Sequence, residues 1–311
     1  MKKQRIICVV GPTASGKTEL GISLAKAFDG EIISADSMQI YRDMHIASAA
    51  PDESETQGIR HHLVEFLPYG SSFTVADYVK IAREKIVEVA AKGKIPIVVG
   101  GTGLYINSLV NNVEFIDNET DMMLRKRITA EFDRIGGAEM LKRLGEIDDV
   151  TASKLHENDK RRIIRAFEIF ESTGNTKSFN DEMSLKNESP YEVCMIGITY
   201  CDRELLYDRI NRRVDIMLKN GLLDEAKAAF NKKMGGGAVQ AIGHKEFFDY
   251  FKGEISLGEA VENLKRSTRR YAKRQLTWFN KDTRINWIYK DKTDDVALTA
   301  INYAKEEENY A

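Results

Sequence analysis

The segment GPTASGKT, residues 11–18, decides the fold that we expect for this chain. It fits the pattern G-x-x-x-x-G-K-[ST], whose glycines let backbone N–H groups turn inward on a phosphate. An apolar run, RIICVV, precedes the segment and a helical pattern, ELGISLAKAF, follows it, so the positive end of a helix points at the anion. In such a loop Lys17 adds a charge and Thr18 can ligate Mg²⁺. The residues expected to hold the phosphate are Gly11, Pro12, Thr13, Ala14, Ser15, Gly16, Lys17 and Thr18.

The composition is that of a globular chain with an apolar core, because 42% of its 311 residues are hydrophobic. The formal net charge of −2 says little about partners, since the charges gather in local clusters. The three cysteines have neither zinc-ligand spacing nor the pattern of a disulfide framework, which favours a reducing compartment. We find no targeting segment and no apolar run that approaches a membrane span. We therefore expect a cytoplasmic protein with no membrane partner.

Short apolar runs alternate with helical stretches from residue 5 to about residue 112. RIICVV, EIISAD and IPIVVGG have the character of buried strands. The helix before IPIVVGG is delimited by a capping signal at Thr74 and Asp77 and by Gly93 at its end. This alternation predicts an α/β fold with a parallel sheet, whose ligands bind at the carboxyl edge of the strands.

Charged helical stretches replace the strand signals between about residues 114 and 190, and EVCMIGITY (192–200) then returns as a buried strand. We therefore expect a core domain built from residues 1–113 and 191–311, interrupted by a helical insertion at 114–190. The polar tail after Trp287 is expected to be peripheral.

Asp36 follows the second apolar run, in a loop that can lie beside the phosphate loop. A carboxylate next to a diphosphate is unfavourable unless Mg²⁺ or a proton-bearing substrate offsets it, which favours a metal ligand or a base. The alternative is a turn-forming or helix-capping aspartate. Three glycines in GGTG (100–103) permit close backbone approach to a ligand, and Thr102 adds a hydroxyl at that edge.

The usual nucleotide-hydrolysing classes lack their partner motifs here. The nearest match to a guanine-reading Asn-Lys-x-Asp is NKDT (280–283), which has Thr in the last position. The strand IPIVVGG ends in glycines instead of the acid that a motor or helicase ATPase uses to hold Mg²⁺. The phosphate loop alone does not distinguish a nucleotide from another diphosphate.

Basic residues cluster in two helical segments. In NLKRSTRRYAKRQLTWF (263–279), two series of cations recur every four residues, with aromatic residues among them. A second cluster includes Arg161, Arg162 and Arg165, on an amphipathic helix whose apolar side includes Ile163 and Ile164. The alternatives are solvated helix faces and binding of a polyanion such as a structured RNA.

The chain resembles the tRNA dimethylallyltransferase (tRNA isopentenyltransferase) family of the bacterial type. The likeness rests on segments that follow one another along nearly the whole chain: GPTASGKT, ISADSMQIYRDM, HHLVEF, VVGGTGLY, NDKRRIIRAFEIF, RRVDIML, GLLDE, AIGHKE and TRRYAKRQLTWF. The resemblance implies a P-loop NTPase-like core, with the insertion binding tRNA. It also implies transfer of a dimethylallyl group from dimethylallyl diphosphate to N6 of the adenosine immediately 3′ of the anticodon, assisted by Mg²⁺ and releasing diphosphate.

The family's functional positions carry over to residues of this sequence. Asp36 resembles the general base, Thr102 a position near the target nucleotide, and Arg213 a stabiliser of the departing diphosphate. Thr18 would hold Mg²⁺, and residues 11–18 would hold the donor diphosphate. The positions expected to contact the anticodon stem-loop of tRNA are Asp36, Ser37, Met38, Gln39, Thr102, Arg125, Arg161, Arg162, Ile163, Ile164 and Arg165. We expect a monomer.

Three positions depart from the pattern usual in the family: Arg161, His244 and Ala50 stand where many relatives have Gln, Tyr and Lys. Other functions also stay open. A P-loop small-molecule kinase would use a similar loop, although the basic helices have no purpose in it. An enzyme that prenylates free adenine nucleotides would not need two cationic surfaces, and an RNA-binding module would not need Asp36.

Overall fold

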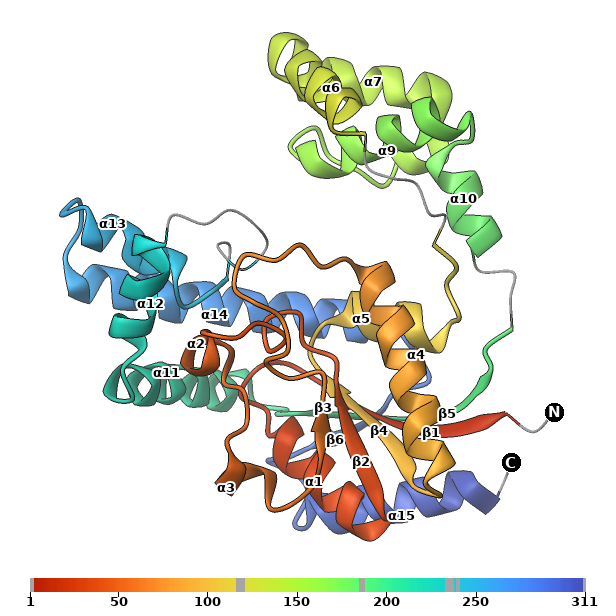
Figure 1. Cartoon of the computed structure of the whole chain (residues 1–311), viewed down its shortest axis with the longest axis vertical. Coiled ribbons are helices and arrows are strands. Elements are labelled where there is room, and N and C mark those ends of the chain that lie inside the picture. The colour runs from red at the N-terminus through yellow and green to blue at the C-terminus, as the bar shows by residue number, and fades with distance from the viewer. Residues whose placement is uncertain (1–2, 116–120, 185–187, 233–237, 239–240, 310–311) are drawn as a thin grey trace. The chain divides into compact units, whose positions relative to one another are not determined.

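The computed structural model describes residues 3–115, 121–184, 188–232, 238 and 241–309. The chain divides into two compact units (Figure 1). The first comprises Met1–Val110 and Pro190–Ala311, and the second comprises Asn111–Ser189. The sequence predicts 114–190 for the corresponding insertion. Within the described residues, no helix combines the length and the apolar character that crossing a bilayer requires.

A six-stranded parallel sheet forms the centre of the first unit, in the order β3-β2-β4-β1-β5-β6. This arrangement confirms the predicted α/β fold. Its strands are β1 (Gln4–Val10), β2 (Gly30–Ser34), β3 (His61–His62), β4 (Ile95–Gly100), β5 (Tyr191–Thr199) and β6 (Asn286–Tyr289).

Helices cover both faces of the sheet, which explains why its strands are apolar along their whole length. Ile6 and Cys8 of β1 pack on one face with α4 and α5, whereas Ile7 and Val9 pack on the other with α1 and α15. The bounds of these helices are α1 (Lys17–Ala27), α4 (Val75–Ala91), α5 (Gly103–Val110) and α15 (Val296–Asn309). The predicted capping box of α4 is present, with Thr74 and Asp77 each bonding to the other's backbone N–H.

The tail after Trp287 is part of the core, which corrects the expectation that it is peripheral. β6 pairs with β5, and Ala300 and Ala304 of α15 are fully buried in the cluster that contains α1. The small side chains of Ala300 and Ala304 allow α15 to pack closely on the core, and Ile301 and Tyr303 pack beside them.

Of the remaining helices of the first unit, α2, α3, α11, η2 and α14 contribute residues to the walls of the phosphate site, and α12 and α13 pack against them. α14 crosses the sheet end near α5, and α11 and α12 lie beside it (Figure 1). These elements are α2 (His45–Ser48), α3 (Glu53–Thr56), α11 (Arg203–Lys219), α12 (Leu222–Asn231), η2 (Lys245–Phe247), α13 (Phe248–Phe251) and α14 (Leu257–Phe279).

In the described residues of the second unit all the regular elements are helices, and the unit has a core of its own. Ile128 and Phe132 pack with Leu144, Ile163 and Phe167. Its helices are α6 (Met122–Ile135), α7 (Gly137–Ile147), α8 (Asp149–Ala152), α9 (Lys160–Thr173) and α10 (Lys177–Ser184).

Candidate active site

The phosphate loop joins β1 to α1, as the sequence predicts. Gly11 has a φ of 149°, and a Cβ there would lie 2.3 Å from the carbonyl oxygen of Ile198. Gly16, with a φ of 100°, is the N-cap of α1, so the first free N–H groups of the helix face the loop. The Lys17 ammonium donates to the carbonyl of Pro12 at 2.6 Å, which folds the side chain back over the loop. The loop is thus shaped as an anion cradle.

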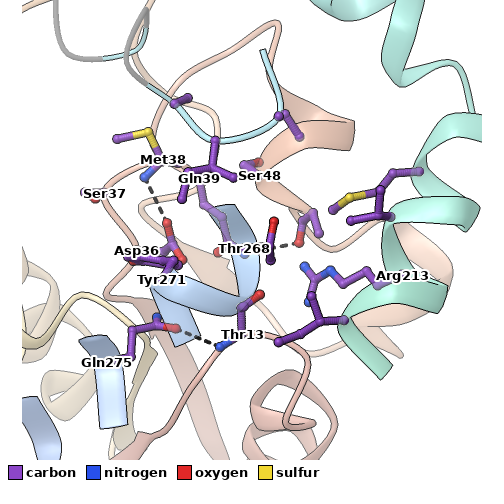
Figure 2. Close-up of a pocket in the computed structure, with 18 of the residues that line it drawn as sticks. Thr13, Asp36, Ser37, Met38, Gln39, Ser48, Arg213, Thr268, Tyr271 and Gln275 are labelled. Carbon is purple, nitrogen blue, oxygen red and sulfur yellow. Dashed lines mark hydrogen bonds between the residues drawn. The ribbon is translucent and has the colours of Figure 1, made fainter. Parts of the chain in front are cut away.

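A cavity of about 320 Å³ opens on one side of this loop (Figure 2). Asp36, Arg213 and Tyr271 line it together with Thr13, Lys17 and Thr18 of the loop. The neighbouring cavity, of about 770 Å³, lies toward α2 and α3 and also includes Lys17, Thr18 and Arg213 in its wall. These three side chains are therefore accessible from both cavities.

The cavity brings positive charges close to one another. Burial and the nearby Arg213 guanidinium lower the pKa of Lys17 to about 7, while Asp36 acts in the opposite direction. Burial likewise lowers the pKa of Arg213, and the negative charge of Asp36 partly offsets it. Each cation is thus held in a site that disfavours its charge, and an anion bound between them would relieve that cost. This is the electrostatic arrangement of a site for a highly charged anion.

Asp36 is both a turn residue and a cavity residue. Its Oδ1 accepts the backbone N–H of Met38 at 2.9 Å, as the turn-forming alternative predicts. No hydrogen bond to Oδ2 occurs among the residues that the structure describes, and the carboxylate faces the cavity (Figure 2). The two interpretations are therefore compatible, because one oxygen fixes the side chain and leaves the other for a ligand.

The loop after β2 does not lie directly beside the phosphate loop, since β4 separates β2 from β1. The loop after β4 lies between the loop after β2 and the phosphate loop. Thr102 Oγ1 accepts the backbone N–H of Ser37 at 3.0 Å, and the N–H of Thr102 donates to the Ala35 carbonyl at 3.1 Å. Thr102 thus supports the Asp36 loop.

Comparisons with known proteins identify the family of a chain that has this anion loop, two half-buried cations and a carboxylate. The sequence profile of the IPP transferase family matches residues 39–282. A tRNA dimethylallyltransferase of Acetivibrio thermocellus is 48% identical over 93% of this chain and 93% of its own, and one of Bacillus velezensis is 45% identical over 92% and 91%.

The chain belongs to the IPP transferase family. Two solved structures are similar over 99% of the chain. The tRNA isopentenylpyrophosphate transferase of Bacillus halodurans has 40% identity, a TM-score of 0.75 and 98% of its own chain covered. A eukaryotic dimethylallyltransferase described as acting on tRNA has 28% identity, a TM-score of 0.84 and 80% covered.

Gln275 is a site residue of this IPP transferase that the sequence interpretation missed. Its side chain, 5% exposed, accepts the N–H of Thr13 at 2.8 Å and donates to the carbonyl of Gly101 at 2.9 Å (Figure 2). One amide of α14 thereby links the loops after β1 and β4. The available signal was a polar residue in the buried stripe of α14, between Ala272 and Phe279.

The glycines of GGTG are needed for the protein's own packing, and Gly100 also lines the cavity, so close approach of a ligand there stays a prediction. A Cβ on Gly100 would lie 2.2 Å from the Ala35 carbonyl oxygen, and one on Gly101 the same distance from Gln275 Nε2. On Gly103 it would lie 2.2 Å from the ring of Trp278. At each of these three glycines, another segment of the chain lies where a Cβ would be.

The far wall of the cavity is held by Glu225 of α12. Its carboxylate accepts the N–H groups of Ile46 and Ala47 at 2.8 and 2.9 Å, which caps α2. The ring of His244, fully buried, lies 2.9 Å from the same carboxylate. His244, a departure from the usual family pattern, therefore has a structural partner. His62 likewise bonds to the buried Glu31 at 2.8 Å, away from the cavity.

Some of the insertion residues that are expected to contact RNA are exposed, and others are buried. Arg161 and Arg162 are exposed on α9. Arg125 and Arg165 both pair with the buried Glu168, at 3.1 and 3.4 Å, which holds them in place. Ile163 and Ile164 are 0% and 5% exposed and pack in the core of the insertion. Their burial corrects the expectation that these two side chains contact RNA.

The two cationic series of α14 also have different environments. Lys265 forms an ion pair with Asp215 of α11 at 2.7 Å, and Arg269 donates to Asn211 at 2.6 Å. These two cations join α14 to α11 instead of facing solvent. The other series, Arg266, Arg270 and Arg274, is exposed together with Lys273. Only this second face has the character of a binding surface.

Proposed function

We propose that this protein transfers a dimethylallyl group from dimethylallyl diphosphate to N6 of the adenosine immediately 3′ of the anticodon in tRNA, releasing diphosphate. The observation that carries the proposal is a single cavity that presents both an anion loop with Lys17 and Arg213 and, facing it, the carboxylate of Asp36. The relatives named tRNA dimethylallyltransferase support the same reaction class.

The leaving group sets the first chemical requirement. As the bond between C1 of the prenyl group and the diphosphate oxygen breaks, negative charge grows on that oxygen. The loop N–H groups, Lys17 and Arg213 would stabilise that charge, because the folded loop and α11 already hold them beside the cavity. Binding of the diphosphate would restore the protonated form of Lys17, whose pKa is lowered to about 7 in the free protein.

The nucleophile sets the second requirement. The exocyclic amine of adenine is weak because its lone pair is delocalised into the ring, so removal of a proton helps as the C–N bond forms. Asp36 would accept that proton through Oδ2, while Met38 and Thr102 hold its loop in position. A base inside a folded anticodon loop must leave its stack to reach this carboxylate, so we expect base flipping.

The loop fits an Mg²⁺ ion bound together with the diphosphate. Thr18 lines both cavities, and its hydroxyl has no hydrogen bond among the described residues. The described residues contain no group of three or more Asp, Glu, His or Cys side chains that could hold a metal ion by itself. Thr18 would therefore supply a protein ligand and the diphosphate the others, and the ion would neutralise part of the leaving group's charge.

A product assay tests the proposal. Purified protein is incubated with unmodified tRNA, dimethylallyl diphosphate and Mg²⁺, and the tRNA is digested and analysed by mass spectrometry. We expect one prenyl group on the adenosine 3′ of the anticodon. Wild-type protein that yields no adduct contradicts the proposal, an adduct on free AMP or ADP alone identifies a nucleotide prenyltransferase, and ATP-dependent phosphorylation of a small molecule identifies a kinase.

The role of Asp36 is tested by substitution with a matched control. Asp36→Asn keeps the size and the turn hydrogen bond but removes the base, so we expect transfer to be nearly abolished and tRNA affinity retained. Asp29→Asn is the control, because Asp29 is exposed at the opposite end of β2 and has a positive φ of 46° that Asn tolerates. Full activity of Asp36→Asn would overturn the assignment of the base.

A further inference from the structure

Helices α11 and α14 together form one wall of the cavity that contains Asp36, and they run in opposite directions. Two side-chain contacts define their register: Lys265 pairs with Asp215 at 2.7 Å, and Arg269 donates to Asn211 at 2.6 Å. The N-terminal half of α14 therefore lies beside the C-terminal half of α11. This register determines which lining residues of the two helices are neighbours.

The lining changes from polar to apolar along this wall. At one end, burial raises the pKa of the Tyr271 phenol, and the nearby charge of Asp36 adds to the rise. Leu264 precedes Tyr271 on α14 by about 10 Å along the helix axis. There it belongs to the same apolar cluster as Val214 of α11, against which Met217 also packs. The cavity therefore has a polar end at Asp36 and an apolar end at Leu264 and Met217.

Met217 lies at the boundary between two cavities. It lines both the cavity of about 320 Å³ and the neighbouring cavity of about 770 Å³, as does Ala49. Arg213, one helical turn earlier on α11, also lines both. Beyond Met217 the larger cavity continues along Ile46 and Ile216. The Met217 side chain is therefore part of the wall that divides the apolar end of the first cavity from the space behind it.

We propose that Met217 closes the apolar end of the cavity and limits the prenyl donor to one isoprene unit. The proposal rests on the proposed function for the nature of the donor and adds a limit on its length. In a direct displacement the C1–O bond breaks on one side of C1 while the C–N bond forms on the other. With the diphosphate at Arg213 and the amine at Asp36, the rest of the prenyl chain must leave that line sideways. The apolar end offers it a surface from which water is readily displaced.

A methionine is suited to such a boundary. Its unbranched thioether fills irregular space and packs against both aliphatic and aromatic groups. A dimethylallyl group would end against the Met217 side chain. The second isoprene unit of geranyl diphosphate would need the volume that this side chain occupies. Truncation of Met217 would join the two cavities and supply that volume.

Competition between two donors tests the limit. The protein is incubated with unmodified tRNA and equal concentrations of dimethylallyl and geranyl diphosphate, and the digested tRNA is analysed by mass spectrometry. Wild-type protein should transfer almost exclusively the dimethylallyl group. M217A should raise the ratio of geranyl to dimethylallyl product by about 10- to 200-fold, the discrimination that one methylene provides in an apolar pocket.

Two variants serve as matched controls. Ile216 is the preceding residue of α11 and, of the two cavities, lines the larger, so I216A should leave the product ratio unchanged. M217L keeps a similar apolar volume and should stay close to wild type. M217V replaces M217A if the latter folds poorly, and should change the ratio in the same direction. Equal transfer of both donors by wild-type protein, an unchanged ratio in M217A and M217V, or an equal change in I216A overturns the limit.

A binding measurement separates this limit from the reaction. Calorimetry without tRNA uses unreactive donor analogues in which sulfur replaces the oxygen between the prenyl group and the diphosphate. M217A should gain affinity for the geranyl analogue by about 10- to 200-fold over wild type. Inorganic diphosphate, which has no prenyl tail, should bind both proteins equally. Weaker binding of inorganic diphosphate to M217A would place Met217 in the diphosphate site and overturn the proposal.

The two proposals fail in different ways. Failure of the proposed function would appear as wild-type protein that yields no prenylated tRNA with either donor. Failure of the length limit would appear as dimethylallylated tRNA from wild-type protein together with an M217A variant that still rejects the geranyl donor and its analogue.

Discussion

Replacing Gly101 by Ala should damage the site through one identified contact, and removing that contact should make the replacement harmless. The added methyl would lie 2.2 Å from Gln275 Nε2, and the next atoms, Gln275 Cδ and the Gly11 carbonyl oxygen, are at 3.4 and 3.5 Å. The φ of Gly101 is outside the left-handed region, so the substitution adds no backbone strain. The whole effect should therefore pass through the displaced amide of Gln275.

The size of the effect follows from the two hydrogen bonds of that amide. Gln275→Ala leaves the Thr13 N–H and the Gly101 carbonyl unpaired, at about 1–3 kcal/mol each, so about 2–6 kcal/mol of unfolding free energy is lost. Gly101→Ala pushes the amide away and breaks the same two bonds, with a similar loss. In the double variant the methyl group occupies the space that the Gln275 side chain has left. The double variant should therefore lose about as much unfolding free energy as either single variant. We expect a coupling of about 2 kcal/mol or more between the two sites.

Urea unfolding followed by tryptophan fluorescence measures this cycle. Trp278 and Trp287 both belong to the first unit, so the signal excludes unfolding of the insertion. Gly258→Ala is the control, because the nearest atom to its Cβ is Ser256 Oγ at 3.9 Å and Ala favours the helix. Additivity of the two single variants to within about 0.5 kcal/mol would refute the reasoning, since independent sites behave in that way.

Three further predictions concern charge. Because the pKa of Lys17 is lowered to about 7 and an anion favours its charged form, inorganic diphosphate should bind with proton uptake and lose affinity as the pH rises above 7. Calorimetry in buffers of different ionisation enthalpy measures the uptake, and Lys17→Met should remove it. Arg161→Ala should lower the slope of log affinity for tRNA against log salt by about one phosphate contact. Arg165→Ala should lower this slope less, because the Arg165 side chain is already paired with a carboxylate. Equal slopes for the two variants would contradict this prediction. Glu225→Ala leaves two N–H groups and the His244 ring without their acceptor and should lower the unfolding free energy by about 2 kcal/mol or more, which urea titration checks.

The elements that the sequence predicts correctly are those with local causes. The phosphate loop follows from glycine spacing between an apolar run and a helix, and α4 follows from the pair Thr74 and Asp77. The four longest strands follow from uninterrupted apolar runs, because both faces of a parallel sheet are buried. Such signals need only the residues within one or two turns of the feature.

The elements that escaped prediction depend on pairing between distant segments. The position of β4 between β1 and β2 is set by the crossover connections, so the sequence of the Asp36 loop does not reveal its neighbour. The short β3 and β6 have too few residues for a pattern. Ile163 and Ile164 belong to a segment expected to contact RNA, although their apolar character and helical spacing place their side chains on the buried side.

The phosphate loop owes its form in the free protein to helices that follow the insertion. Gln275 bonds to the N–H of Thr13 across 262 residues, and Arg209 of α11 donates to the carbonyl of Ala14 at 3.1 Å across 195 residues. Arg213 and Tyr271 come from these same two helices. The anion site is therefore complete only when both parts of the core have packed together. The glycine-rich motif locates the loop, whereas helices without a comparable short motif supply the side chains that complete the cavity around it.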